Sequence, residues 1–325
     1  MEAVNAGLSA GAGTRLLVDY PQEQRGYVLD YLFKPSFGAS LQVLKLEIGG
    51  TGDSTTGTED SHERTRGDIN MTRGYELWFA EEVLARNEEI VLYGLAWTFP
   101  QWVELAPEGF GKAAVTYLVD CASASLIALV LIAAFSADGR GFSGVVGAEA
   151  TLSHPISYLG FHNESPWQIE WVLDLRAELD RRGKPHVKLV VADCGPGAGF
   201  QTPELVQWMQ SNTSLSEAAA AVGLHYPNSI MPGRTSPDYY RNLSSLPGKQ
   251  KLWSSEEFST PATKAGARCL AKLFSRNFVD ANLTSSIVWS IIYAWYPDLA
   301  CSGQGLIWAP EPWSGRIGVV DTVMV

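Results

Sequence analysis

Lys251-Leu-Trp-Ser-Ser-Glu-Glu-Phe-Ser-Thr260 begins as a short strand and ends in a run of Ser, Glu and Thr that a hydrophobic core does not accommodate. A carboxylate at the end of a buried strand needs a partner or a chemical role, because an unpaired buried charge is costly. The stretch Ile156-Ser-Tyr-Leu-Gly-Phe-His-Asn-Glu-Ser165 has the same design and leads to Glu164. The sequence therefore predicts a site built from carboxylates at strand ends.

Around these two stretches, apolar strands alternate with amphipathic helices. The predicted strands are 41–48, 90–97, a short one around 158, 187–193, 221–227, 252–255 and 286–293. The predicted helices are 22–33, 73–86, 167–182 and 263–278. Strands that are apolar throughout and alternate with helices indicate a parallel sheet covered by those helices.

Two folds fit this order of elements, a doubly wound sheet and a (β/α)8 TIM barrel. Polar residues gather at the C-terminal end of nearly every strand, which favours the barrel. Only seven strands are countable, so we expect a barrel that is incomplete at its N-terminus. The eighth strand would precede Met1 or be formed by the first few residues. Gly7–Leu17 is predicted to be a glycine-rich loop that runs into a helix.

Composition excludes several classes of protein. Hydrophobic residues make up 46% of the 325 residues and charged residues 18%, which is typical of a globular protein. The net charge of −11 and the lack of a basic run argue against nucleic-acid binding. The four cysteines form no C-x-x-C pair, so we expect no zinc site. The apolar stretch 122–134 is too short to span a bilayer, and no transmembrane span is predicted.

The two carboxylates indicate a reaction class. Retaining glycosidases use two carboxyl groups about 5 Å apart, one as nucleophile and one as general acid and base. When the uncounted N-terminal strand is numbered one, Glu164 ends the predicted fourth strand and Glu256 the seventh, and these strands face each other across a barrel mouth. In the alternative interpretation, each glutamate stabilises the N-terminus of a following helix. The glycosidase interpretation requires neither a metal nor a cofactor.

These motifs also resemble those of a known family, the galactocerebrosidases (galactosylceramidases), retaining β-galactosidases of glycoside hydrolase family 59. The resemblance covers most of residues 7–315, in order. It rests on the segments 14–21, 32–40, Glu47-Ile-Gly-Gly50, Gly57-Thr-Glu59 with Ser61-His62, Arg73-Gly-Tyr-Glu76, Asn163-Glu164, His225-Tyr-Pro227, 252–260 and Glu311-Pro-Trp-Ser-Gly315.

The resemblance implies roles for individual residues. Glu256 is the expected nucleophile, Glu164 the expected acid/base, and Glu257 a supporting residue. Galactose would be held by Thr55, Trp97 and Asn163, and the site lined by Ser259 and Trp289. The two histidines of the matching motifs, His62 and His225, are expected to be core residues.

The resemblance also bears on domains, substrate and location. We expect a catalytic barrel over residues 1–315 with an atypical insertion at 121–153, followed by an atypical tail at 316–325. The β-sandwich and lectin-like domains of the family and a signal peptide are expected to be absent. The implied substrate is a galactosylceramide-like glycosphingolipid or another β-galactoside, presented by a saposin-type protein. The implied location is the lysosome or the extracellular space.

Two alternatives remain open at this stage. The chain would be a truncated, inactive barrel that only binds sugar, or a relative that hydrolyses a different β-glycoside.

Overall fold

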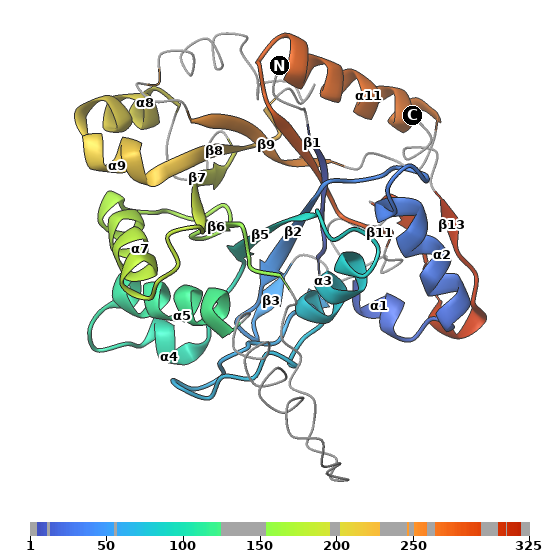
Figure 1. The fold of residues 1–325 in the computed structure, drawn as a ribbon, viewed down its shortest axis with the longest axis horizontal. Helices are drawn as coiled ribbons and strands as arrows, with labels where there is room; N and C mark the ends of the chain where they lie inside the picture. The colour runs from blue at the N-terminus through green and yellow to red at the C-terminus, as the bar shows by residue number, and fades with distance from the viewer. Residues whose placement is uncertain are drawn as a thin grey trace, which may run out of the picture.

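The computed structural model of the protein describes residues 5–11, 14–54, 57–124, 154–195, 202–227, 246, 250–258, 264–293, 305–309 and 311–319. Within these residues, eight parallel strands close into a barrel, and helices lie in a ring around it (Figure 1). The strands are β1 (Asn5–Ser9), β2 (Val43–Ile48), β5 (Val91–Ala96), β6 (Tyr158–Gly160), β7 (Lys188–Cys194), β8 (Ala219–His225), β9 (Lys251–Phe258) and β10 (Ser285–Trp289). The expected (β/α)8 architecture is confirmed.

The barrel is complete in this structure, so the expectation of an incomplete barrel was wrong. The uncounted strand is formed by the first few residues, which is one of the two places expected for it. β1 pairs in parallel with β2 on one side and with β10 on the other. Sequence inspection missed this strand because its residues are small and only weakly apolar. The small size has a packing reason, since a Cβ atom at Gly7 would lie 2.8 Å from the Cβ of Val43. Part of the predicted glycine-rich loop is therefore a barrel strand.

The helices around the barrel are α1 (Arg15–Val18), α2 (Gln22–Phe33), α3 (Glu76–Leu84), α4 (Gln101–Glu104), α5 (Phe110–Ala124), α7 (Ile169–Arg181), α8 (Thr202–Ser211), α9 (Thr213–Ala218) and α11 (Lys264–Val279). The four predicted helix ranges correspond to α2, α3, α7 and α11, and the structure has further helices that were not predicted. Among the helices of the described residues, none has the length and apolar composition needed to cross a bilayer.

Short elements complete the fold. A two-stranded sheet is formed by β3 (Asp53–Ser54) and β4 (Gly57–Thr58), and a three-stranded sheet by β11 (Ile292–Tyr293), β12 (Ile307–Trp308) and β13 (Gly318–Val319). The single predicted strand 286–293 is divided between β10 and β11.

Two segments predicted to be atypical are described only in part. α5 continues to Ala124, and Cys121 and Ala122 within it are buried in the core, whereas 125–153 lies outside the described residues. Beyond residue 315, β13 pairs antiparallel with β12, and the hydroxyl of Tyr20 donates to the carbonyl of Arg316. The proposed domain limits remain predictions.

The core has two parts, one between strands and helices and one inside the barrel. The inner part consists of Val43, Tyr93, Leu95, Tyr158, Val190, Ala221, Trp253 and Ile287. These side chains fill the barrel interior, as is usual for this fold, so a site can form only at its mouth.

Candidate active site

Glu256 points into the barrel because β9 contains a bulge. Trp253 packs in the interior, so strict alternation along the strand would direct Glu257 inward and Glu256 outward. The pairing of β9 shifts register against both neighbours, with one extra residue on β9 each time. A bulge of this kind redirects the side chains beyond it. As a result, Glu256 is directed inward.

Two donors hold the Glu256 carboxylate. Lys45 on β2 is fully buried, and its Nζ lies 3.2 Å from Glu256 Oε2 and donates to the Ser255 carbonyl at 3.0 Å. The hydroxyl of Tyr226 donates to Glu256 Oε1. Both carboxylate oxygens are therefore fixed, and the charge of Glu256 has a buried cation beside it.

Glu257 has a different environment. Its Oε1 accepts hydrogen bonds from Ser254 Oγ at 2.8 Å and from Asn277 Nδ2 of α11 at 3.0 Å. It lies between barrel and helix, and burial raises the pKa of its carboxyl to about 7. Of the two adjacent acids, only Glu256 faces the barrel mouth.

Glu164 approaches from the loop after β6. Its backbone adopts a left-handed conformation with φ of 45°, and its N–H donates to the carbonyl of Asp193 at 3.0 Å. Its side chain is 42% exposed, in contrast to the 5% of Glu256. The more solvent-accessible carboxyl is the one suited to exchange protons with a leaving group and with water.

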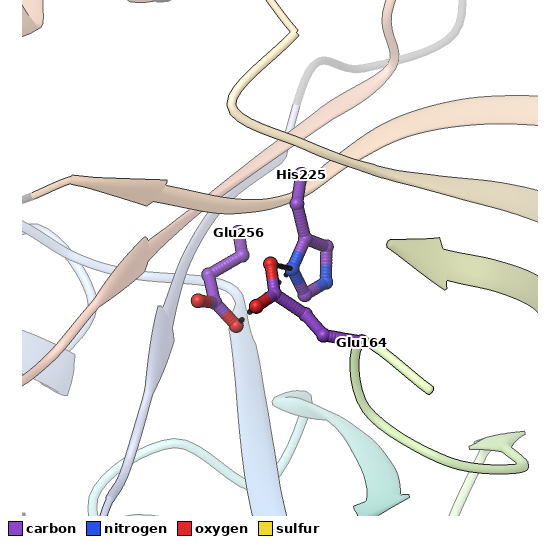
Figure 2. A group of neighbouring side chains, drawn as sticks. All are labelled: Glu164, His225 and Glu256. Carbon is purple, nitrogen blue, oxygen red and sulfur yellow. Dashed lines mark hydrogen bonds and ion pairs between the residues drawn. The ribbon is translucent and has the colours of Figure 1, made fainter. Parts of the chain in front are cut away.

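His225, at the end of β8, lies beside the two glutamates and directs Nδ1 toward both carboxylates (Figure 2). Its Nδ1 is 3.0 Å from Glu164 Oε1 and 3.6 Å from Glu256 Oε2. Burial alone would lower the pKa of His225, but the charge of Glu256 and contacts with Asp193 and Glu164 raise it above its usual value. The raised pKa favours the protonated form of this imidazole.

The nitrogen and carboxylate atoms of this trio lie within 4.8 Å of one another, so among the described residues these three side chains could hold a metal ion. The ammonium group of Lys45, 3.2 Å from Glu256, already supplies positive charge there. A metal ion would have to compete with it.

Two tryptophans expected at the site lie next to this group. The ring centre of Trp97 is 4.9 Å from Lys45 Nζ. Trp289 at the end of β10 donates from Nε1 to Glu47 Oε1 at 2.8 Å, and burial raises the pKa of Glu47 to about 8.

The other expected site residues are only partly described. The Oδ1 atom of Asn163 is buried and has no hydrogen-bond partner among the described residues, so it is available to a ligand. Thr55 and Ser259 lie outside the described residues.

The histidine expectation held for one of the two residues. His62 stacks on Tyr117 with ring centres 4.2 Å apart, and burial lowers the pKa of His62 to about 4, as expected for a core residue. His225 is equally buried but contacts both glutamates. Sequence reasoning also overlooked Lys45, Tyr226 and Asp193 as site residues. Lys45 could have been found as one of two charged residues, with Glu47, inside a strand that is otherwise apolar.

A closed parallel barrel with paired carboxylates at the C-terminal ends of its fourth and seventh strands defines the class of barrel glycoside hydrolases. The sequence model of Glycosyl hydrolase family 59 matches residues 1–128 and 142–325. The chain belongs to this family.

Its curated relatives include the galactocerebrosidases of mouse and human. The chain is 34% identical to the mouse protein over 324 residues, covering 100% of the chain and 42% of the relative. It is 35% identical to the human protein over 324 residues, with the same coverage of 100% and 42%. The chain therefore spans less than half the length of these relatives.

Solved structures show the same fold at low identity. SrfJ from Salmonella typhimurium has a TM-score of 0.71 at 12% identity, covering 99% of this chain and 73% of that chain. The endo-β1,6-glucanase BT3312 has a TM-score of 0.68 at 15% identity, covering 100% and 75%. At such identities the likeness supports the barrel and no particular substrate.

Proposed function

We propose that this protein is a retaining β-galactosidase that removes terminal β-galactosyl residues from galactosylceramide-like glycosphingolipids. The observation that carries the mechanism is the proximity of carboxylate oxygens of Glu164 and Glu256, within 4.8 Å. Retaining enzymes hold their carboxyl groups about 5 Å apart, whereas inverting enzymes leave roughly 6.5–9.5 Å for a water molecule.

In the first step, Glu256 attacks the anomeric carbon while the bond to the leaving oxygen breaks. The proton of the Glu164 carboxyl passes to that oxygen. In the second step, Glu164 takes a proton from water, the water oxygen attacks the anomeric carbon, and Glu256 leaves as a carboxylate. The bonds of Lys45 and Tyr226 to Glu256 orient the nucleophile for both steps.

His225 contributes a charge that suits both states of the cycle. Before reaction Glu256 is the anion, and in the glycosyl-enzyme intermediate Glu164 is the anion. Because His225 Nδ1 lies 3.0 Å from Glu164 and 3.6 Å from Glu256, it stays close to whichever carboxylate is charged. The positive charge need not move during the reaction, which limits reorganisation of the site.

The name galactocerebrosidase of the relatives supports a galactolipid substrate. We further propose, from the family resemblance alone, that a saposin-type protein presents this substrate, in the lysosome or outside the cell. Asn163 with its unpaired Oδ1 and the ring of Trp97 are the groups proposed to hold the galactose, together with Thr55, Ser259 and Trp289.

Hydrolysis of an aryl β-galactoside at acidic pH tests the proposal. We expect turnover by the chain, and a loss of at least about a thousandfold in Glu256→Gln, because the covalent step is removed. Glu257→Gln is the matched control, because Glu257 faces α11 and the glutamine would keep an acceptor for Asn277. The activity of this variant should stay within about tenfold of that of the unsubstituted chain.

NMR identifies the anomer of galactose that is released first. This measurement separates retention of the anomeric configuration from inversion. Binding of galactose without turnover would favour the alternative of a barrel that only binds sugar, and turnover of another aryl β-glycoside in preference would favour a different substrate.

A further inference from the structure

We propose that Asp193 is a positioning residue, which holds the acid/base Glu164 through its backbone and orients His225 through its side chain. The inference rests on the proposed function, since it assigns a supporting role at the same site. Asp193 acts through Glu164 and through His225, whose Nδ1 lies 3.6 Å from the nucleophile Glu256.

The backbone of Asp193 is built for this contact. β7 ends in two consecutive non-glycine residues in the left-handed region, Ala192 with φ of 82° and Asp193 with φ of 48°. Such conformations persist where the surrounding structure enforces them, often at functional sites. Here the turn directs the Asp193 carbonyl at the N–H of Glu164, 3.0 Å away. The acid/base loop is thereby tied to the end of β7.

The side chain of Asp193 is buried inside the barrel mouth between two partners. Its Oδ2 accepts a hydrogen bond from the hydroxyl of Tyr93. Its Oδ1 lies 3.9 Å from His225 Nε2. Neither Oδ1 nor Nε2 has a hydrogen-bond partner within the described residues, and both are buried. Buried polar groups are nearly always paired, so each is the natural partner of the other.

Two glycines make room for this carboxylate. A Cβ atom at Gly160 of β6 would lie 2.7 Å from Asp193 Oδ2, and one at Gly223 of β8 would lie 2.6 Å from Oδ1. Any other residue at either position would displace the carboxylate. The strands on both sides of β7 are thus shaped around Asp193.

The consequence concerns the charge of His225. Nε2 faces the Asp193 carboxylate at 3.9 Å and Nδ1 faces Glu164 at 3.0 Å, so each ring nitrogen has a carboxyl oxygen to which a proton can be directed. A proton on both nitrogens gives the imidazolium form, which we infer for His225. The titratable and charged groups around the ring are Glu164 after β6, Asp193 on β7, Tyr226 after β8, Glu256 and Glu257 on β9, and Lys45 on β2. Lys45 opposes the charge, so the carboxylates must outweigh it. Of the two buried carboxyls that take no part in the reaction, Asp193 and Glu257, it is Asp193 that has an oxygen close to the ring, at 3.9 Å from Nε2.

Titration of His225, followed by NMR of its ring, tests the proposal in Asp193→Asn. The amide keeps the shape of the carboxyl and an acceptor for Tyr93 but removes the charge. We expect the His225 pKa to fall by about 1 unit or more, since an opposite charge at this range contributes about 1–3 units. The kcat of the variant should fall at least about tenfold, and the pH profile of kcat should shift with the titration.

Two further measurements complete the design. Tyr93→Phe removes the other partner of Asp193 without changing a charge, so it should leave the His225 titration within about 0.5 unit of the parent. In the unsubstituted protein, NMR should show His225 as an imidazolium at pH 5. This measurement does not depend on whether a variant folds.

An unchanged His225 titration in folded Asp193→Asn, or a neutral His225 at pH 5 in the parent, would overturn the proposal. Neither readout depends on turnover. A failure of the proposed galactosidase activity would therefore be recognised separately, through Glu256→Gln.

Discussion

At the scale of single residues, the Lys45–Glu256 ion pair is the contact on which the site depends. Both side chains are withdrawn from water, with exposures of 0% and 5%, and the pair spans 3.2 Å. A buried pair adds little net stability compared with an apolar pair, but losing one partner leaves an uncompensated charge. The pair is therefore sensitive to single substitutions and tolerant of paired ones.

We expect Lys45→Met to lower the free energy of unfolding by about 3–5 kcal/mol. The double variant Lys45→Met/Glu256→Gln should recover part of this loss, with a coupling of about 0.5–3 kcal/mol, because no charge remains buried alone. Urea denaturation measures both. Lys112→Met, at an exposed position on α5, serves as control and should change stability by about 0.5 kcal/mol or less. Equal stability of the single and double variants would contradict the argument.

At the scale of elements, the helix ring is held by close contacts at small residues. α5 meets α7 where Trp171 packs over Gly111, and a Cβ at Gly111 would lie 2.2 Å from Trp171 Nε1. The indole cannot move aside easily, because it also stacks on Phe161 and meets Phe110 edge to face.

Gly111→Ala and Gly26→Ala should therefore change stability in opposite directions. Gly111→Ala is expected to cost about 1–3 kcal/mol through overpacking. A Cβ atom at Gly26, in α2, would meet only a nitrogen of Arg86, at 3.9 Å. Alanine there should stabilise the fold by about 0.4–1 kcal/mol, because it reduces the conformational entropy of the unfolded chain. Thermal unfolding of both variants measures these changes. A midpoint temperature that shifts in the same direction in both variants would show that the α5–α7 contact is looser than described.

At the scale of the whole molecule, several buried carboxylic acids favour folding at acidic pH. Burial raises the pKa of Glu47 to about 8 and of Glu59 and Glu257 to about 7, and that of Glu76 well above its usual range. Groups with raised folded pKa values stabilise the fold fully below their unfolded pKa, near 4.5, and lose this effect as pH rises through the folded values. His62, with its pKa lowered to about 4, opposes the trend only below about pH 6.5.

The free energy of unfolding should therefore be lower at pH 8 than at pH 6.5. The expected difference is at least about 1.4 kcal/mol, the equivalent of one pKa unit of a single group. Urea denaturation at the two pH values measures it, and Glu47→Gln, which removes the carboxyl with a pKa of about 8, should flatten the dependence. Stability that increases toward pH 8 would show that these carboxyls are ionised in the fold. Stability at acidic pH fits the proposed lysosomal location.

Local patterns in the sequence were sufficient for the barrel class, for helices such as α2 and for the two glutamates, because apolar periodicity and strand-end polarity are properties of short segments. They missed β1, whose small residues are required only by its packing against Val43 of β2.

The inward orientation of Glu256 was decided by tertiary structure. Alternation from Trp253 would direct Glu257 into the barrel, and the bulge that reverses this arises from the pairing of β9 with both neighbouring strands. The contacts of Lys45, Asp193 and His225 with the glutamates have the same origin. They join residues far apart in the chain, and only closure of the barrel brings these side chains to one mouth.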